Sequence, residues 1–260
     1  MKWPVIALLL VAAAPAHARE LKVCADPNNL PFSNSQNAGF ENRIVDIVAR
    51  ELKADVTYVW HAQRRGNVRE TLNEGLCDLI PGVASSLEML ATTRPYYRST
   101  YVAVVRDPAL KGLANFDDPR LEELRIGVQL IGDDGANSPP AHALARRGII
   151  DNVRGYTIYG DYDSPAPQAP ILDALARGDI DVAFVWGPTA GYFARSEPVA
   201  LTIAPVEPQS DGPALPMVFD ISMGVRRDDL ALKREVEGAL AKHAGDIAKV
   251  LAEFGVPTLN

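Results

Sequence analysis

Hydrophobic residues at every second position, followed by turn-forming residues, mark the first strand of the chain. Residues 21–25 alternate in this way, and a proline and two asparagines at 27–29 then favour a turn. Ligands of open α/β sheets bind outside the carboxyl ends of the strands. Asp26, Asn28 and Asn29 are therefore candidates for a binding surface, and a simple surface turn is the alternative interpretation.

Helical and strand patterns alternate along the rest of the chain. Through residue 105 we predict strands at 21–25, 56–60, 77–83 and 101–105, and helices at 41–53, 67–74 and 85–91. From residue 124 the construction repeats, with strands at 124–128, 153–159, 180–186, 201–206 and 219–225 and helices at 139–147, 170–177, 230–243 and 246–254. Such alternation is typical of an α/β fold with parallel strands.

The repeated construction predicts two Rossmann-like lobes. The chain would cross between them twice, so two strands would join the lobes and leave a cleft between them. We expect residues 19–106 with 222–260 to form lobe 1 and residues 107–221 to form lobe 2. Because small ligands commonly bind in clefts at domain interfaces, we expect a ligand or a partner to bind in the interlobe cleft.

A second polar segment follows the strand at 124–128. It contains two glycines together with Asp133, Asp134 and Asn137, and a later turn contains Asp161. Glycine-rich loops can bind phosphate through backbone amides, but the two carboxylates at 133 and 134 would repel an anion. A tight solvent-exposed turn and a polar or cationic contact are the two interpretations of this segment.

Two arginines and two aromatic residues are further candidates for the cleft. Arg64 and Arg65 form a cationic loop that could clamp a carboxylate, although such pairs are more often solvated or bound to nearby acids. Tyr96 and Trp186 lie at strand ends, where aromatic side chains either line a cleft or fill the core. For Trp186 we expect the cleft, because a Gly-Pro pair breaks the strand directly after it.

The N-terminus has the features of an export signal. Lys2 supplies a positive charge, residues 5–14 are apolar, and Ala16 and Ala18 are the small residues that a signal peptidase recognises. The apolar run is shorter than the roughly 20 residues that a membrane-spanning helix needs. We therefore expect residues 1–18 to be a signal peptide cleaved after Ala18, and a periplasmic protein without membrane insertion.

Composition narrows the classes of partner and the chemistry. The 260 residues are 47% hydrophobic and 23% charged, enough for one large domain or for two lobes with their own cores. The net charge of −7 argues against nucleic-acid binding, which depends on lysine and arginine at phosphates. In an exported protein the even pair Cys24 and Cys77 favours a disulfide between neighbouring strands, with two buried thiols as the alternative.

Catalytic and metal-binding patterns are weak in this sequence. The four histidines are scattered, and none has an acid or a thiol at a spacing typical of catalysis. No cluster of histidine, cysteine and acidic residues has metal-ligand spacing. We expect neither an enzyme nor a cofactor or metal site.

Four short motifs in the observed order resemble type II periplasmic substrate-binding proteins, the family that includes the amino-acid receptors of ABC importers. They are GFE at 39–41, GLCDL at 75–79, RPYY at 94–97 and GDIDVA at 178–183. The resemblance covers residues 21–254 and implies two lobes joined by two hinge strands with an interlobe cleft. It agrees with the fold class that the alternating pattern predicts.

Longer blocks are similar to the J proteins of methanol oxidation, MxaJ and XoxJ, which are receptor-like periplasmic proteins associated with quinoprotein alcohol dehydrogenases. The blocks lie at 24–34, 63–66, 93–101, 132–137, 185–188 and 219–226. Phe32 and Arg94 lie within them and join the expected cleft or partner contacts. The resemblance implies a monomeric accessory protein that contacts a quinoprotein methanol or alcohol dehydrogenase, or its cytochrome c, and supports assembly, activation or cofactor loading.

The sequence departs from amino-acid receptors at two charged positions. Those receptors usually place an arginine soon after the third strand, where this chain reads SSLEM at 85–89, and an acid where Trp186 and Gly187 stand. Without these anchors a zwitterion would lose several kcal/mol for each unpaired charge. The alternative function is therefore delivery of an unidentified small molecule, not a standard amino acid, to an importer or to the dehydrogenase.

Overall fold

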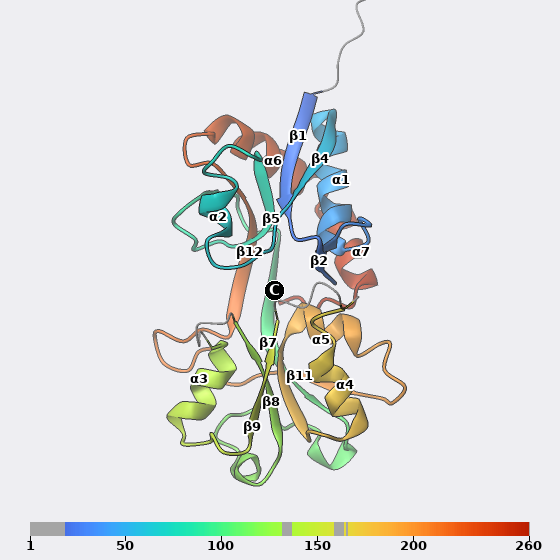
Figure 1. Ribbon diagram of the computed structural model, residues 1–260, viewed down its shortest axis with the longest axis vertical. Helices are drawn as coiled ribbons and strands as arrows, with labels where there is room; N and C mark the ends of the chain where they lie inside the picture. The colour runs from blue at the N-terminus through green and yellow to red at the C-terminus, as the bar shows by residue number, and fades with distance from the viewer. Residues whose placement is uncertain (1–18, 132–136, 159–163, 165, 260) are drawn as a thin grey trace, which may run out of the picture.

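The computed structural model describes residues 19–131, 137–158, 164 and 166–259 (Figure 1). The predicted signal segment 1–18, with its cleavage site, lies outside the described residues. So do three of the predicted site residues, Asp133, Asp134 and Asp161. Within the described residues, each helix is too short or too polar to cross a membrane.

Lobe 1 is built around the N-terminal strands. Its elements are β1 (Arg19–Ala25), the hairpin of β2 (Asn28–Asn29) and β3 (Ser33–Asn34), α1 (Phe40–Leu52), β4 (Ala54–Trp60), α2 (Asn67–Glu70), β5 (Leu79–Ala84), β6 (Ala91–Thr92), α6 (Leu230–Lys242) and α7 (Ala244–Glu253). Strand β1 pairs in parallel with β4 and with β5. Helix α1 buries Phe40, Ile44 and Val48 against this sheet and ends at Lys53, whose φ of 53° is left-handed.

Lobe 2 repeats the parallel arrangement. Its elements are η1 (Pro108–Leu110), η2 (Pro119–Glu122), β8 (Ile126–Leu130), α3 (Pro139–Arg146), β9 (Val153–Thr157), α4 (Pro170–Arg177), β10 (Val182–Trp186), α5 (Gly187–Phe193) and β11 (Thr202–Pro205). Strand β8 pairs in parallel with both β9 and β10. Its core includes Phe116 and Phe184, whose ring centroids are 5.0 Å apart.

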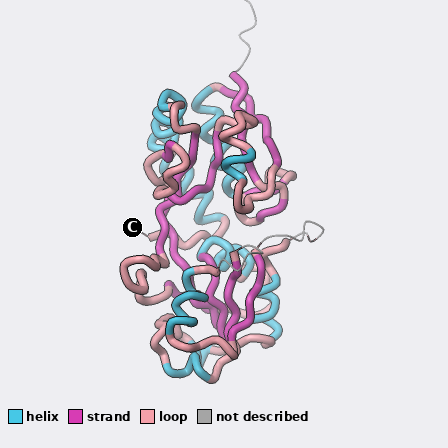
Figure 2. The backbone as a smooth tube through the Cα atoms, turned by 60° about the vertical axis from the view of Figure 1, so that its left-hand side comes forward, coloured by secondary structure: helices cyan, strands magenta, loops and turns pink. Residues whose placement is uncertain are grey.

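Two long strands, β7 (Tyr97–Val105) and β12 (Val218–Val225), join the lobes, and we call them the hinge strands. They pair with each other between Val218 and Ile221; β12 then continues along β5, and β7 continues between β10 and β11. The strand order is β4-β1-β5-β12-β7-β10-β8-β9. Figures 1 and 2 show one lobe above the other, with the hinge strands running between them. The predicted α/β fold with two lobes and two hinge strands is confirmed.

The predicted pairing of the two cysteines is also confirmed. Cys24 and Cys77 form a disulfide with their Cα atoms 5.6 Å apart, within the range that a disulfide bridges. Cys24 lies in β1, whereas Cys77 precedes β5 by two residues instead of lying in the strand. The bond therefore ties the loop that enters β5 to the strand that precedes the first polar turn.

Several local predictions differ from the structure. Residues 85–91 form turns and the start of β6, because Ser85 bonds to the Asp220 carbonyl on β12 through both its backbone N–H and its hydroxyl, instead of starting a helix. Helix α2 ends at Glu70 instead of residue 74. The Gly187 and Pro188 pair ends β10 as expected but also begins α5, since proline is favoured in the first helical turn.

Candidate functional site

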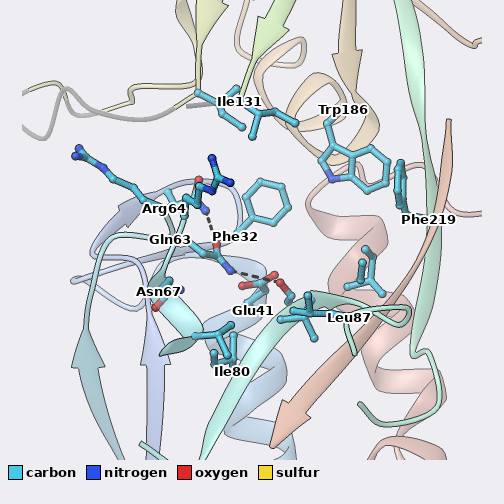
Figure 3. Close-up of a pocket in the computed structure, with 18 of the residues that line it drawn as sticks. Phe32, Glu41, Gln63, Arg64, Asn67, Ile80, Leu87, Ile131, Trp186 and Phe219 are labelled. Atoms are coloured by element: carbon cyan, nitrogen blue, oxygen red, sulfur yellow. Dashed lines mark hydrogen bonds between the residues drawn. The ribbon is translucent and has the colours of Figure 1, made fainter. Parts of the chain in front are cut away.

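A cavity of about 840 Å³ lies between the lobes, within the size range of small-molecule sites (Figure 3). Both lobes and both hinge strands contribute to its lining. Lobe 1 supplies Phe32 and Ile80, lobe 2 supplies Trp186, and the hinge strands supply Tyr101 and Phe219. The cavity is therefore the cleft that the two-lobe arrangement predicts.

Aromatic side chains form the wall where lobe 2 meets the hinge strands. The ring centroid of Trp186 lies 5.2 Å from that of Tyr101 and 5.8 Å from that of Phe219, in tilted or edge-on arrangements. Figure 3 shows Trp186 and Phe219 side by side at the cavity. Trp186 and Phe219 are only half-buried, so each presents a face to an occupant. Trp186 therefore lies where the sequence places it, at the cleft.

A chain of side-chain amides crosses from lobe 2 to lobe 1 beside the cavity. The Thr189 hydroxyl donates to the Gln168 carbonyl oxygen at 2.8 Å, and the Gln168 amide donates to Asn29. Asn29 in turn donates to Gln63 at 3.0 Å, and Gln63 donates to the Gly82 carbonyl at 3.3 Å. We call these five residues the amide chain. All hydrogen bonds of the chain run in the same direction, from Thr189 toward Gly82. The three amide side chains between them therefore each accept one hydrogen bond through the oxygen and donate one through the NH2 group.

Asp26 organises the turn that carries Asn29. Its carboxylate accepts hydrogen bonds from the backbone N–H groups of Asn28 at 2.8 Å and Gln63 at 2.7 Å, and its carbonyl accepts one from the Ser33 hydroxyl. Asp26 is buried and lies outside the cavity lining. The Asn28 side chain donates to the Ser164 carbonyl of lobe 2 at 2.7 Å. Of the first polar turn, only Asn29 lines the cavity; Asp26 and Asn28 hold it in place.

The carboxyl group of Glu41 lies at the lobe 1 side of the cavity, in the first turn of α1. It is 3% exposed and packs against the backbone of β5, since a Cβ atom added to Gly82 would lie 1.8 Å from Glu41 Oε1. Burial, and to a lesser extent the nearby Asp26 carboxylate, raises the pKa of Glu41 to about 8. At neutral pH this group is therefore predominantly a neutral carboxylic acid.

The cationic loop lies at the rim. Arg64, Arg65 and Arg69 belong to the lining and have exposed side chains. Gly66, at φ 97°, starts α2 within this loop and adopts a backbone conformation that residues with side chains rarely take. In the part of the chain that the structure describes, no group of three or more histidine, cysteine and acidic residues gathers to hold a metal ion.

Comparison with known proteins identifies the family, although no family model matches the chain. Protein MoxJ of Methylorubrum extorquens is 32% identical over 95% of this chain and 84% of its own length. Protein MoxJ of Paracoccus denitrificans is 32% identical over 97% of this chain and 94% of its own length. The chain belongs to the MoxJ family.

Solved structures agree with this assignment. The periplasmic binding protein XoxJ from Methylobacterium extorquens is 37% identical, with a TM-score of 0.75 over 92% of this chain and 99% of that chain. MxaJ from Methlophaga aminisulfidivorans is 29% identical, also with a TM-score of 0.75, over 92% and 100%. An ancestral cationic amino acid solute binding protein, 18% identical with a TM-score of 0.68, shares the fold. This MoxJ-family chain thus has the type II periplasmic binding fold.

The predicted site residues of the MoxJ-family chain fall into two groups. Five of the predicted residues line the cavity, namely Asn29, Phe32, Arg64, Arg65 and Trp186. Arg94 is exposed and its backbone N–H donates to Glu237 of α6 at 2.8 Å, while the Tyr96 hydroxyl donates to the Pro81 carbonyl at 3.0 Å. Asn137 forms a β-bridge with Leu130. These last three lie outside the lining, as do Asp26 and Asn28.

Several polar lining residues escape the sequence interpretation. In the sequence, Glu41 was noted only as part of the GFE motif at 39–41, and Gln63 only as part of the block at 63–66. Gln129 lies in β8, where its side-chain oxygen accepts the backbone N–H of Trp186 at 2.7 Å. Gln129 and Gln168 are both buried. Gln129 could have been recognised as a polar residue inside the otherwise apolar strand β8, because a buried amide requires hydrogen-bond partners.

Proposed function

We propose that this MoxJ-family protein is a periplasmic accessory protein of a PQQ-dependent methanol or alcohol dehydrogenase system. It supports assembly, activation or cofactor loading by contact with the dehydrogenase, or with its cytochrome c, and acts as a monomer with a binding rather than a catalytic role. The observation that carries this proposal is the similarity to MoxJ proteins along almost the whole chain. The Cys24–Cys77 disulfide is in keeping with an oxidising compartment such as the periplasm.

Amino-acid receptors usually carry an arginine in the region of residues 85–89 and an acid near Gly187, and the residues of this chain at both positions support a role other than amino-acid uptake. The Ser85 hydroxyl bonds to the Ser222 hydroxyl at 2.6 Å and to the Asp220 carbonyl, so this position fastens the 85–90 turn to β12. At the other anchor, a Cβ atom on Gly187 would lie 2.6 Å from the Thr100 carbonyl oxygen. An acidic side chain at position 187 would therefore collide with hinge strand β7.

A second candidate function rests on the cavity itself. A space of about 840 Å³ with an apolar lining and a few polar groups is typical of a solute-binding protein. In this case the protein delivers a small molecule to an importer or to the dehydrogenase. The two candidate functions use the same fold. In the first the protein acts by contact with a partner protein, and in the second it acts by binding a small molecule in the cleft.

Affinity purification from periplasm tests the first candidate. The tagged, exported protein should co-purify a quinoprotein dehydrogenase or its cytochrome c at low salt, and deletion of its gene should lower dehydrogenase activity in the periplasm. A deletion strain with full activity, together with no capture of either protein after mild crosslinking, contradicts the proposal. A change in the radius of gyration by X-ray scattering, on addition of a small-molecule extract of periplasm, supports the second candidate because lobes close on ligand.

A further inference from the structure

The lobe 1 side of the cavity carries the Glu41 carboxyl group, and among the described residues no arginine or lysine contributes to the shift of its pKa. The titratable groups that interact electrostatically with Glu41 include the Asp26 carboxylate after β1, the Tyr58 hydroxyl of β4, and the hydroxyls of Tyr96, just before β7, and Tyr97, its first residue. Each of these is acidic or neutral. Burial is the largest influence on all three tyrosines, whose pKa values are raised, so they stay neutral as well.

The position of Glu41 requires a glycine opposite it. Glu41 lies against Gly82, and a larger residue in β5 would occupy the space of its carboxyl group. Gly82 is also the last acceptor of the amide chain, through Gln63. The Glu41 carboxyl group, Gly82 and the lobe 1 amide of Gln63 thus lie together on the lobe 1 side of the cavity.

Aromatic side chains from both lobes and from a hinge strand also line the cavity. Trp186 and Phe219 face it from lobe 2 and hinge strand β12, and Phe32 lines it from lobe 1 (Figure 3). All three rings are half-buried, so an apolar body entering between them would be desolvated on several faces. Such packing favours a ring-sized apolar ligand.

We propose that the cavity binds a small uncharged molecule, whose apolar, ring-sized body packs between Phe32, Trp186 and Phe219 and whose carbonyl or ether oxygen accepts a hydrogen bond from the carboxylic acid group of Glu41. This inference rests on the solute-binding candidate function and specifies its ligand class. It does not depend on contact with a dehydrogenase, so a binding measurement on the isolated protein tests it separately.

Charged ligands fit this surface less well. An anion that reached Glu41 would also approach the Asp26 carboxylate. A cation would have to pass the rim of Arg64, Arg65 and Arg69 and would have to draw the proton from a buried acid. An uncharged acceptor costs neither repulsion nor proton loss, because a protonated carboxyl group donates one hydrogen bond.

Equilibrium dialysis of the intact mature protein at about pH 6.5, where the Glu41 acid is protonated, tests the ligand class. The probes are benzophenone, diphenylmethane without the carbonyl oxygen, the anion 4-benzoylbenzoate and the cation 4-(aminomethyl)benzophenone. Benzophenone should bind about tenfold more tightly than each of the other three. No saturable binding of benzophenone, or equal or tighter binding of any of the other probes, overturns the proposal.

Variants at position 41 locate the hydrogen bond. Glu41→Gln keeps a donor and should retain benzophenone affinity within about threefold, whereas Glu41→Leu should lower it about tenfold, to that of diphenylmethane. Unchanged benzophenone affinity in Glu41→Leu overturns the proposal. Photolabelling of the unsubstituted protein with benzophenone provides a readout that does not depend on the folding of a variant. Covalent label at Phe32, Trp186, Phe219 or their cavity neighbours supports the site, and label confined to other surfaces overturns it.

Discussion

Carboxyl groups in the cavity and on the outer parts of lobe 2 have opposite surroundings. Asp181, directly before β10, bonds to Arg125 at 2.6 Å, and this hydrogen bond lowers the pKa of Asp181. Asp117 bonds to Arg147 at 2.6 Å, with the same direction of shift. Glu41 instead has burial and another carboxylate around it, which raise its pKa.

This difference shows how the chain keeps ionised carboxylates out of the cavity lining on the lobe 1 side. Arginines stabilise ionised acids where water is near, and the buried acid of the cavity is kept neutral by its surroundings. The cleft therefore offers a donor and several amides without a fixed negative charge at its lobe 1 side. The four predictions below test this contrast, beginning with the largest expected effect.

The pH dependence of stability should differ most between the natural protein and Glu41→Gln. Glu41 keeps its proton in the folded state between pH 4.5 and about 8 and loses it on unfolding, so stability falls as pH rises through this window and levels off above it. Relative to its value at low pH, the loss is on the order of 4 kcal/mol. Glu41→Gln removes this loss, and urea unfolding across pH measures it. Parallel pH curves for the two proteins would show that Glu41 is ionised when folded.

The close packing of Gly82 against Glu41 predicts the next largest effect. Gly82→Ala should lower the free energy of unfolding by about 3 kcal/mol, because its Cβ would lie 1.8 Å from Glu41 Oε1. Gly238→Ala is the control, since a Cβ atom there meets nothing within 4 Å and alanine stabilises a helix such as α6. In Glu41→Ala the same Gly82→Ala change should cost much less. Equal costs in both backgrounds would contradict the contact.

Interruption of the amide chain should have an intermediate effect. Gln168→Leu leaves the buried Thr189 hydroxyl and the Asn29 side-chain oxygen without this partner, which should cost about 2 kcal/mol. Thr189→Val in the same background should then add little, because its partner is already absent. Additive losses in chemical denaturation would mean that the chain does not act as a unit.

The smallest expected effect concerns the ion pair of lobe 2. Asp181→Asn should lower stability by about 0.5 to 1 kcal/mol at neutral pH, because the side chain is partly exposed. Arg125 lowers the pKa of Asp181 below 3.8, so this contribution is present above pH 3.8 and is lost as pH falls through the lowered value. A cost that persists in strong acid would assign the effect to something other than ionisation.

Much of the fold could be predicted from local patterns. Alternating apolar positions predict β1, a continuous apolar run predicts the buried strand β10, and helical spacing of apolar residues predicts α1. The disulfide was predicted from an even pair of cysteines expected on neighbouring strands, and it forms although Cys77 lies two residues before β5. The turn at 85–90 was mistaken for a helix because its partner, Asp220 on β12, is 135 residues away.

The site was less predictable because its key contacts are distant in sequence. Gln168 and Asn29 are 139 residues apart, and the local sequence around either residue does not predict that they form a hydrogen bond. The neutrality of Glu41 depends on burial by β5 and on Asp26, not on its position in the first turn of a helix, where an ionised acid is ordinarily favoured. Candidates chosen by strand ends, such as Asn29 and Trp186, do line the cavity.

Titration of the Glu41 side-chain carboxyl carbon by NMR tests the central claim most directly. The resonance, assigned by its loss in Glu41→Gln, should titrate with a midpoint of about 8 in the folded protein. A midpoint near the ordinary value of 4.5 would contradict the claim, because the cavity would then carry an ionised carboxylate at neutral pH.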